Sequence, residues 1–120
     1  MSASSRAGVA AAGLAFAGAL FAHAMLDRAS PPVGSEVAAA PSRIELWFTE
    51  ALEPTFSSVK LLDAGGRQVD SGDVAFNAGD PGHVVAAVPP LAPGRYRVVW
   101  RAVSVDTHVT SGDYTFDVMH

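Results

Sequence analysis

The chain has 120 residues, a formal net charge of −4 at neutral pH and no cysteine. This length allows one domain and excludes a larger multidomain architecture. The lack of cysteine excludes disulfide bonds and thiolate chemistry, and the lack of any basic run argues against nucleic acid or an anionic membrane surface as a partner.

The first 22 residues have the pattern of a secretory signal. Arg6 is the only charged residue among them, and a run of small and apolar residues continues from there to Ala22. The run is short for a helix that spans a bilayer, which needs about 20 residues. We therefore expect a signal peptide over residues 1–22 and an exported domain over residues 23–120 that is not inserted in the membrane. An uncleaved membrane anchor is the alternative.

The position of the signal cleavage decides the chemistry of His23. Cleavage after Ala22 makes His23 the first residue of the mature protein, with a free α-amine beside its imidazole. Both groups lose their protons close to neutral pH, so this residue can offer two nitrogens to one metal ion. Cleavage after Ala19 or after Ala24 is also conceivable, and the second of these would remove His23.

Beyond the leader, short runs rich in β-forming residues alternate with turns that contain proline or glycine. This pattern is typical of short strands, and no convincing long helix is visible. The predicted strands are 24–29, 43–48, 58–62, 68–69, 83–88, 95–101 and 114–118. Six or seven short antiparallel strands in about a hundred residues predict an all-β Greek-key sandwich or flattened barrel.

The apolar positions that alternate within these runs are the candidate core. They are Leu26, Ile44, Leu46, Phe48, Val59, Leu61, Val85, Tyr96, Val98, Trp100, Phe116 and Val118. Trp100 is in phase with these positions, so we expect it in the core, whereas Trp47 is out of phase and is expected at a rim. A stacking platform for sugars or bases is the alternative for the two tryptophans.

Asp106 and His108 follow the apolar strand that ends at Val103. In an extended backbone, residues i and i+2 project to the same side, so this spacing brings an oxygen and a nitrogen to one point. Together with the two nitrogens of His23 they suggest a square N,O site of the kind that Cu(II) favours. Such a site requires the chain start to lie beside the 106–108 segment. The alternative is a solvated loop with a hydrogen-bonded aspartate and histidine.

The other polar candidates have simpler interpretations. His83 follows a turn rich in glycine and proline and is predicted to be an exposed turn residue, and His120 is the last residue of the sequence. Glu50 and Glu53 follow a strand, where paired carboxylates either serve acid–base catalysis or are simply solvated. No nucleophile, phosphate-loop or zinc-protease motif accompanies them, so we do not expect an enzyme.

Two blocks of the sequence carry a family resemblance. The first comprises residues 23–26, 30–37 and 44–50, and the second comprises residues 91–108. Both resemble the CopC family of periplasmic copper-resistance proteins, and the match covers nearly all of residues 23–118. The resemblance implies a seven-stranded Greek-key β-barrel of cupredoxin-like or immunoglobulin-like topology.

The resemblance also implies a set of metal ligands. The family binds Cu(II) with an N-terminal histidine and its amine, and with an aspartate and a histidine in an Asp-x-His segment. These positions correspond to His23, Asp106 and His108, and a glutamate at the position of Glu50 is associated with the same site in some members. Members with a separate Cu(I) site carry a methionine-rich loop, but residues 61–84 contain no methionine. We therefore expect one site, selective for Cu(II).

These observations predict a periplasmic protein that binds Cu(II) and sequesters or carries it, for copper resistance or for delivery. The resemblance implies transfer to an inner-membrane copper importer resembling CopD, and we expect a monomer. A copper-dependent oxidative enzyme with an N-terminal histidine brace is one alternative, and a structural sandwich module without a metal is another. The few aromatic residues outside the leader and the carboxylate near the copper argue against the enzyme.

Overall fold

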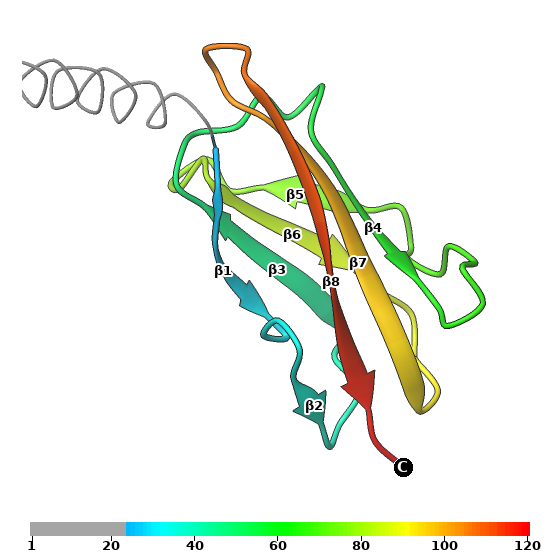
Figure 1. Cartoon of the computed structure of the whole chain (residues 1–120). Coiled ribbons are helices and arrows are strands. Elements are labelled where there is room, and N and C mark those ends of the chain that lie inside the picture. Colours follow the sequence, from blue (N-terminus) through cyan, green and yellow to red (C-terminus); the bar gives the residue numbers. More distant parts are fainter. Residues whose placement is uncertain (1–23) are drawn as a thin grey trace, which may run out of the picture.

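The computed structural model describes residues 24–120, which form two four-stranded β-sheets packed face to face (Figure 1). The strands are β1 (Leu26–Ser30), β2 (Glu36–Val37), β3 (Arg43–Phe48), β4 (Ser58–Leu62), β5 (Val74–Phe76), β6 (His83–Ala87), β7 (Gly94–Val103) and β8 (Val109–Val118). Within the described residues no helix is long and apolar enough to cross a membrane. The predicted all-β sandwich is confirmed.

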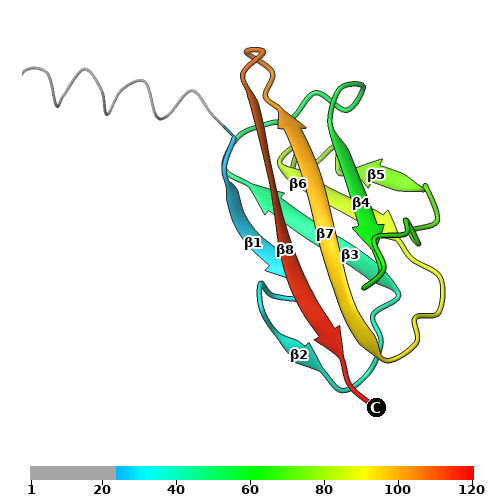
Figure 2. The same ribbon diagram turned by 45° about the vertical axis from the view of Figure 1, so that its right-hand side comes forward.

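The two sheets are interleaved along the sequence. One has the strand order β1-β3-β6-β5, with all pairs antiparallel. The other has the order β2-β8-β7-β4, in which only β2 and β8 are parallel. Most consecutive strands therefore lie in different sheets, as in other Greek-key sandwiches. The long hairpin of β7 and β8 extends along the length of the sandwich (Figure 2).

Most of the predicted strands are present, although their ends differ. Strands β2 and β5 are missed by the sequence pattern because two or three residues are too few to show alternation. The predicted run 68–69 forms no strand, and Gln68 makes only an isolated bridge to Leu62. Strand β8 begins at Val109, well before the predicted start at Tyr114. The sequence pattern misses this first part of the strand because the residues between Val109 and Tyr114 lack an apolar alternation.

The core lies between the sheets and follows the alternation in the sequence. Most predicted core positions are buried, and Leu26 packs against them from a partly buried position. Val85 is wrongly predicted, because Val84 and Ala86 are the buried residues of β6 and Val85 lies on the other side of the strand. The run 83–88 is almost continuously apolar, so its inward phase is not readable from periodicity.

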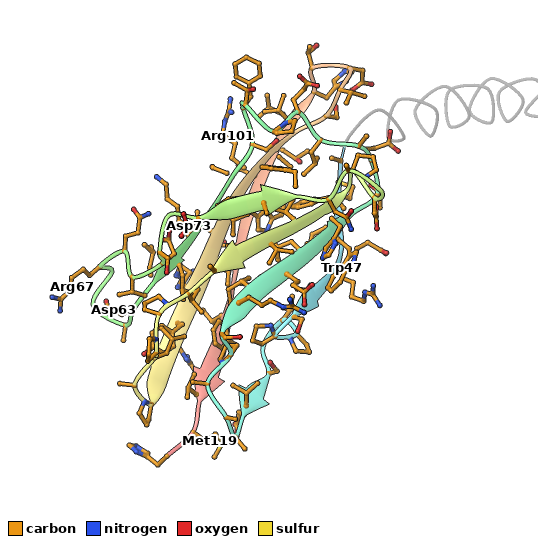
Figure 3. All side chains as sticks on the ribbon, turned by 180° about the vertical axis from the view of Figure 1, so that it is seen from behind. Trp47, Asp63, Arg67, Asp73, Arg101 and Met119 are labelled. Carbon is orange, nitrogen blue, oxygen red and sulfur yellow. The ribbon has the colours of Figure 1, made fainter. Side chains whose placement is uncertain are left out.

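The two tryptophans have different environments. Trp100 is buried as predicted, and its indole lies over Gly112, where an added Cβ would be only 2.6 Å from the ring. Trp47, the residue before the last of β3, lies on the outer face of the sheet that contains this strand (Figure 3). Its ring stacks on His83 at a centroid distance of 4.6 Å, and the Arg28 guanidinium lies 4.1 Å from the ring centre. Side chains from both neighbouring strands therefore lie against the Trp47 ring.

Candidate metal centre

The turn between β7 and β8 carries Asp106 and His108. The Thr107 amide donates to the carbonyl of Ser104 at 2.8 Å, and the Ser104 amide donates to the carbonyl of His108 at 2.9 Å. Thr107, between the two candidate ligands, has a φ of 71°, which is rare for a β-branched residue. The segment is therefore a tight turn and not the extended backbone that the i, i+2 argument assumes.

The two side chains nevertheless converge. Nδ1 of His108 lies 3.2 Å from Oδ1 of Asp106, and about half of each side chain is exposed to solvent. The hydroxyl of Ser104 donates to the same Oδ1. The hydrogen bond from Ser104 and, after it, the one from His108 hold the pKa of Asp106 below its usual value. The carboxylate is thus ionised at neutral pH and available as an oxygen ligand.

The first described residues lie beside this turn. The carbonyl of Ala24, which is fully buried, accepts a hydrogen bond at 2.6 Å from the hydroxyl of Thr110, two residues after His108. Met25 is held by Thr49, whose amide donates to the Met25 carbonyl at 2.9 Å and whose hydroxyl accepts from the Met25 amide at 3.0 Å. The start of β1 and the β7–β8 turn therefore lie at the same end of the sandwich (Figure 1).

Glu50 belongs to the loop that follows β3 and packs along the β7–β8 turn. Leu52 in this loop forms a bridge to Ser104. Glu50 is partly exposed and directly follows Thr49, which holds the first described residues. The backbone thus places Glu50 at the same end of the sandwich as the aspartate and histidine of the turn.

His23 lies outside the described residues. Among residues 24–120, no group of three or more histidine, cysteine, aspartate or glutamate side chains is arranged to hold a metal ion. Asp106 and His108 therefore form a pair of candidate ligands that needs a further donor to complete a copper site. His120 is the C-terminal residue, at the opposite end of the sandwich from the turn (Figure 1).

His83 is not the exposed turn residue that the sequence predicts. It is the first residue of β6, and only 14% of its side chain is exposed. Oδ1 of Asn77 accepts from the amide of Gly79, so the Asn77 amide nitrogen donates to Nδ1 of His83 at 3.2 Å. In this hydrogen-bond network Nε2 carries the proton and donates to Glu45 at 3.0 Å. Both ring nitrogens are engaged, which assigns His83 a structural role on the sheet surface.

Sequence reasoning misses the roles of three hydroxyl residues at the end of the sandwich that carries the β7–β8 turn. Ser104 binds Asp106, while Thr110 and Thr49 hold the first described residues. Serine and threonine are common in turns and on strand surfaces, so their presence near a candidate ligand is not a signal. The roles of Thr110 and Thr49 become visible only when segments far apart in the sequence are placed together, and the role of Ser104 becomes visible only in the turn that it shares with Asp106.

Known proteins resemble this chain in sequence and in fold. The family model of the CopC domain matches residues 26–119. Copper resistance protein C of Escherichia coli is 40% identical over 98 residues, which are 76% of this chain and 78% of that protein. The crystal structure of CopC from Methylosinus trichosporium OB3b is 37% identical, has a TM-score of 0.77, and is matched over 81% of this chain and 94% of that chain.

A second solved structure is also similar to this chain in sequence and fold. The crystal structure of PcoC, a methionine-rich copper resistance protein from Escherichia coli, is 42% identical with a TM-score of 0.72, and the match covers 80% of this chain and 98% of that chain. The two Escherichia coli relatives are both named as copper resistance proteins. A family model that covers most of the chain, with relatives near 40% identity, confirms the resemblance: the chain belongs to the CopC family.

Proposed function

We propose that the protein is exported to the periplasm and begins at His23 after removal of residues 1–22. It then binds one Cu(II) ion through the α-amine and imidazole of His23, the imidazole of His108 and the carboxylate of Asp106. The observation that carries this proposal is the convergence of Asp106 and His108 beside the buried Ala24, the residue that follows His23.

The position of Ala24 supports the participation of His23. Adjacent Cα atoms in a chain are about 3.8 Å apart, and Ala24 is tied to Thr110, two residues after His108. A histidine joined to Ala24 therefore starts close to the β7–β8 turn. Because its amine and imidazole belong to one residue, collecting these two ligands costs less ordering entropy than collecting two separate side chains.

The donor set supports Cu(II) as the metal. Nitrogen ligands with one carboxylate oxygen suit tetragonal Cu(II), whereas Cu(I) prefers sulfur ligands. The Asp106 carboxyl is ionised at neutral pH, so the metal does not have to displace a proton from this oxygen. The relative PcoC is described as methionine-rich, but this chain has three methionines and none of them in residues 61–84. A single Cu(II) site is the consistent interpretation.

The names of the relatives support a role in copper resistance. The protein would sequester or carry Cu(II) in the periplasm as a monomer and transfer it to an inner-membrane importer resembling CopD. Half-exposed ligands on a turn suit this role, since an acceptor must be able to approach the ion. Glu50, at the same end of the sandwich, is a neighbour of the site and not one of the four donor groups.

Expression of the full chain with its leader in a bacterium tests the proposal. Mass spectrometry of the exported protein is expected to identify His23 as the first residue. Competition titration against a Cu(II) chelator is expected to give one site per chain. His108→Ala and Asp106→Asn should each weaken Cu(II) binding by at least about tenfold, while His120→Ala, at the opposite end, should not. A different first residue, or unchanged affinity in both ligand variants, would contradict the proposal.

A further inference from the structure

Ser104 contacts both candidate ligands from beneath the protein surface. Only 1% of Ser104 is exposed, whereas about half of the Asp106 and His108 side chains is exposed. The backbone of Ser104 forms the bridge to Leu52, and its amide donates to the carbonyl of His108. The location of its hydroxyl is therefore set by the buried end of β7 and by the loop beside it.

The hydroxyl of Ser104 has one proton and two acceptors within reach. One acceptor is Oδ1 of Asp106 and the other is the carbonyl of His108 at 3.3 Å, and an ionised carboxylate is a stronger acceptor than a neutral carbonyl. The proton therefore goes to Asp106, and the hydroxyl oxygen accepts from the amide of His108 at 3.3 Å. A carboxylate has about four lone-pair sites, so Asp106 keeps lone pairs for a metal.

We propose that Ser104 is a positioning residue of the copper site, whose hydroxyl holds the Asp106 carboxylate and the His108 backbone in the arrangement that receives Cu(II). This inference rests on the proposed function. Without the hydroxyl, the exposed carboxylate would populate several rotamers, and metal binding would have to order it at an entropic cost. Outer hydrogen-bond partners of metal ligands act in this way, and their loss typically lowers metal affinity about 10- to 100-fold.

Ser104→Ala and Ser57→Ala form a matched pair of variants. Ser57 is also a serine that is not fully exposed and whose hydroxyl binds the end of β7, where it accepts from the amide of Val103 at 3.0 Å. Ser104→Ala should weaken Cu(II) binding of the exported protein about 10- to 100-fold and shift the copper hyperfine splitting in its EPR spectrum. Ser57→Ala should keep the wild-type affinity and spectrum even if it melts at a lower temperature.

Two further variants separate a positioning role from general loosening of the turn. Ser104→Thr retains the hydroxyl and should keep the wild-type spectrum. If circular dichroism shows that Ser104→Ala does not fold, the spectrum of Ser104→Thr becomes the test of the inference. In an Asp106→Ala background, Ser104→Ala should lower the affinity by a smaller factor than it does in the wild type, because the two residues act together.

The outcomes are distinguishable. Wild-type affinity and spectrum in folded Ser104→Ala would overturn the inference, as would an equal loss in Ser57→Ala, a changed spectrum in folded Ser104→Thr, or an undiminished effect in the Asp106→Ala background. The His108→Ala variant separates this result from a failure of the proposed function. If His108→Ala loses affinity and Ser104→Ala does not, only the role of Ser104 is wrong; if neither loses affinity, the site itself is wrong.

Discussion

Thr110→Val replaces the hydroxyl that holds Ala24 by a methyl group of nearly the same shape. The Thr110 hydroxyl donates to the carbonyl of the fully buried Ala24 at 2.6 Å, so the substitution leaves a buried carbonyl without this donor. Such a loss costs about 1–3 kcal/mol. Ala24 is the second residue of the proposed mature chain, and the first residues of a domain detach easily. Release of the chain start is therefore the expected response.

If Cu(II) is coordinated as proposed, release of the chain start should weaken its binding, because binding would then have to order the first residues of the chain as well. A cost of about 1–3 kcal/mol corresponds to about a 5- to 150-fold loss of affinity. Competition titration of the exported variant measures this factor, and Thr110→Ser, which keeps the hydroxyl, is the control with an expected wild-type affinity. A folded Thr110→Val protein that binds Cu(II) as tightly as the wild type would refute the reasoning.

Three further predictions concern stability. Gly112→Ala places a Cβ 2.6 Å from the Trp100 indole and should destabilise the fold by about 1–3 kcal/mol in urea unfolding; a stabilised variant would contradict the packing. Thr107→Asn should stabilise the apo protein by about 1 kcal/mol, because Asn tolerates the positive φ better; a lower melting temperature would count against this. The hydrogen bonds from Arg95 lower the pKa of Asp117 in the folded state. This pair therefore contributes stability above the pKa of aspartate in the unfolded chain, about 3.9. The contribution is lost as the pH falls through the lowered pKa of the folded state. Arg95→Gln should therefore destabilise the protein more at pH 7 than at pH 2, and an equal difference at both pH values would exclude the pair as the cause.

The strands that can be predicted from the sequence are those in which apolar, buried residues alternate with polar, exposed ones. Strand β3 was readable because Ile44, Leu46 and Phe48 are buried and the residues between them are not. The phase of β6 was not readable because its residues are apolar on both sides. Strand β2 exists because Glu36 pairs with Asp117 of β8 in a parallel register. Such a pairing between distant segments leaves no local pattern.

The convergence of the two described ligands was predictable, but the backbone that produces it was not. The spacing of Asp106 and His108 suggested an extended segment, whereas the structure has a tight turn with a left-handed Thr107. The contacts of Ser104 and Thr110 depend on this turn and on the placement of the first described residues. The Thr110 contact joins segments far apart in the sequence, and the Ser104 contact, although local, needs the geometry of the turn, so residue types and spacing encode neither.

The path of β8 has a practical consequence for measurements on this protein. Its ten residues lead from the β7–β8 turn to the opposite end, where the chain finishes (Figure 1). A strand of this length spans about 30 Å, so a fluorophore, linker or sensor surface attached behind His120 stays remote from Asp106 and His108. Immobilisation through the C-terminus would leave the ion-receiving end facing the bulk solution, whereas an N-terminal tag would cap the amine on which the proposed coordination depends.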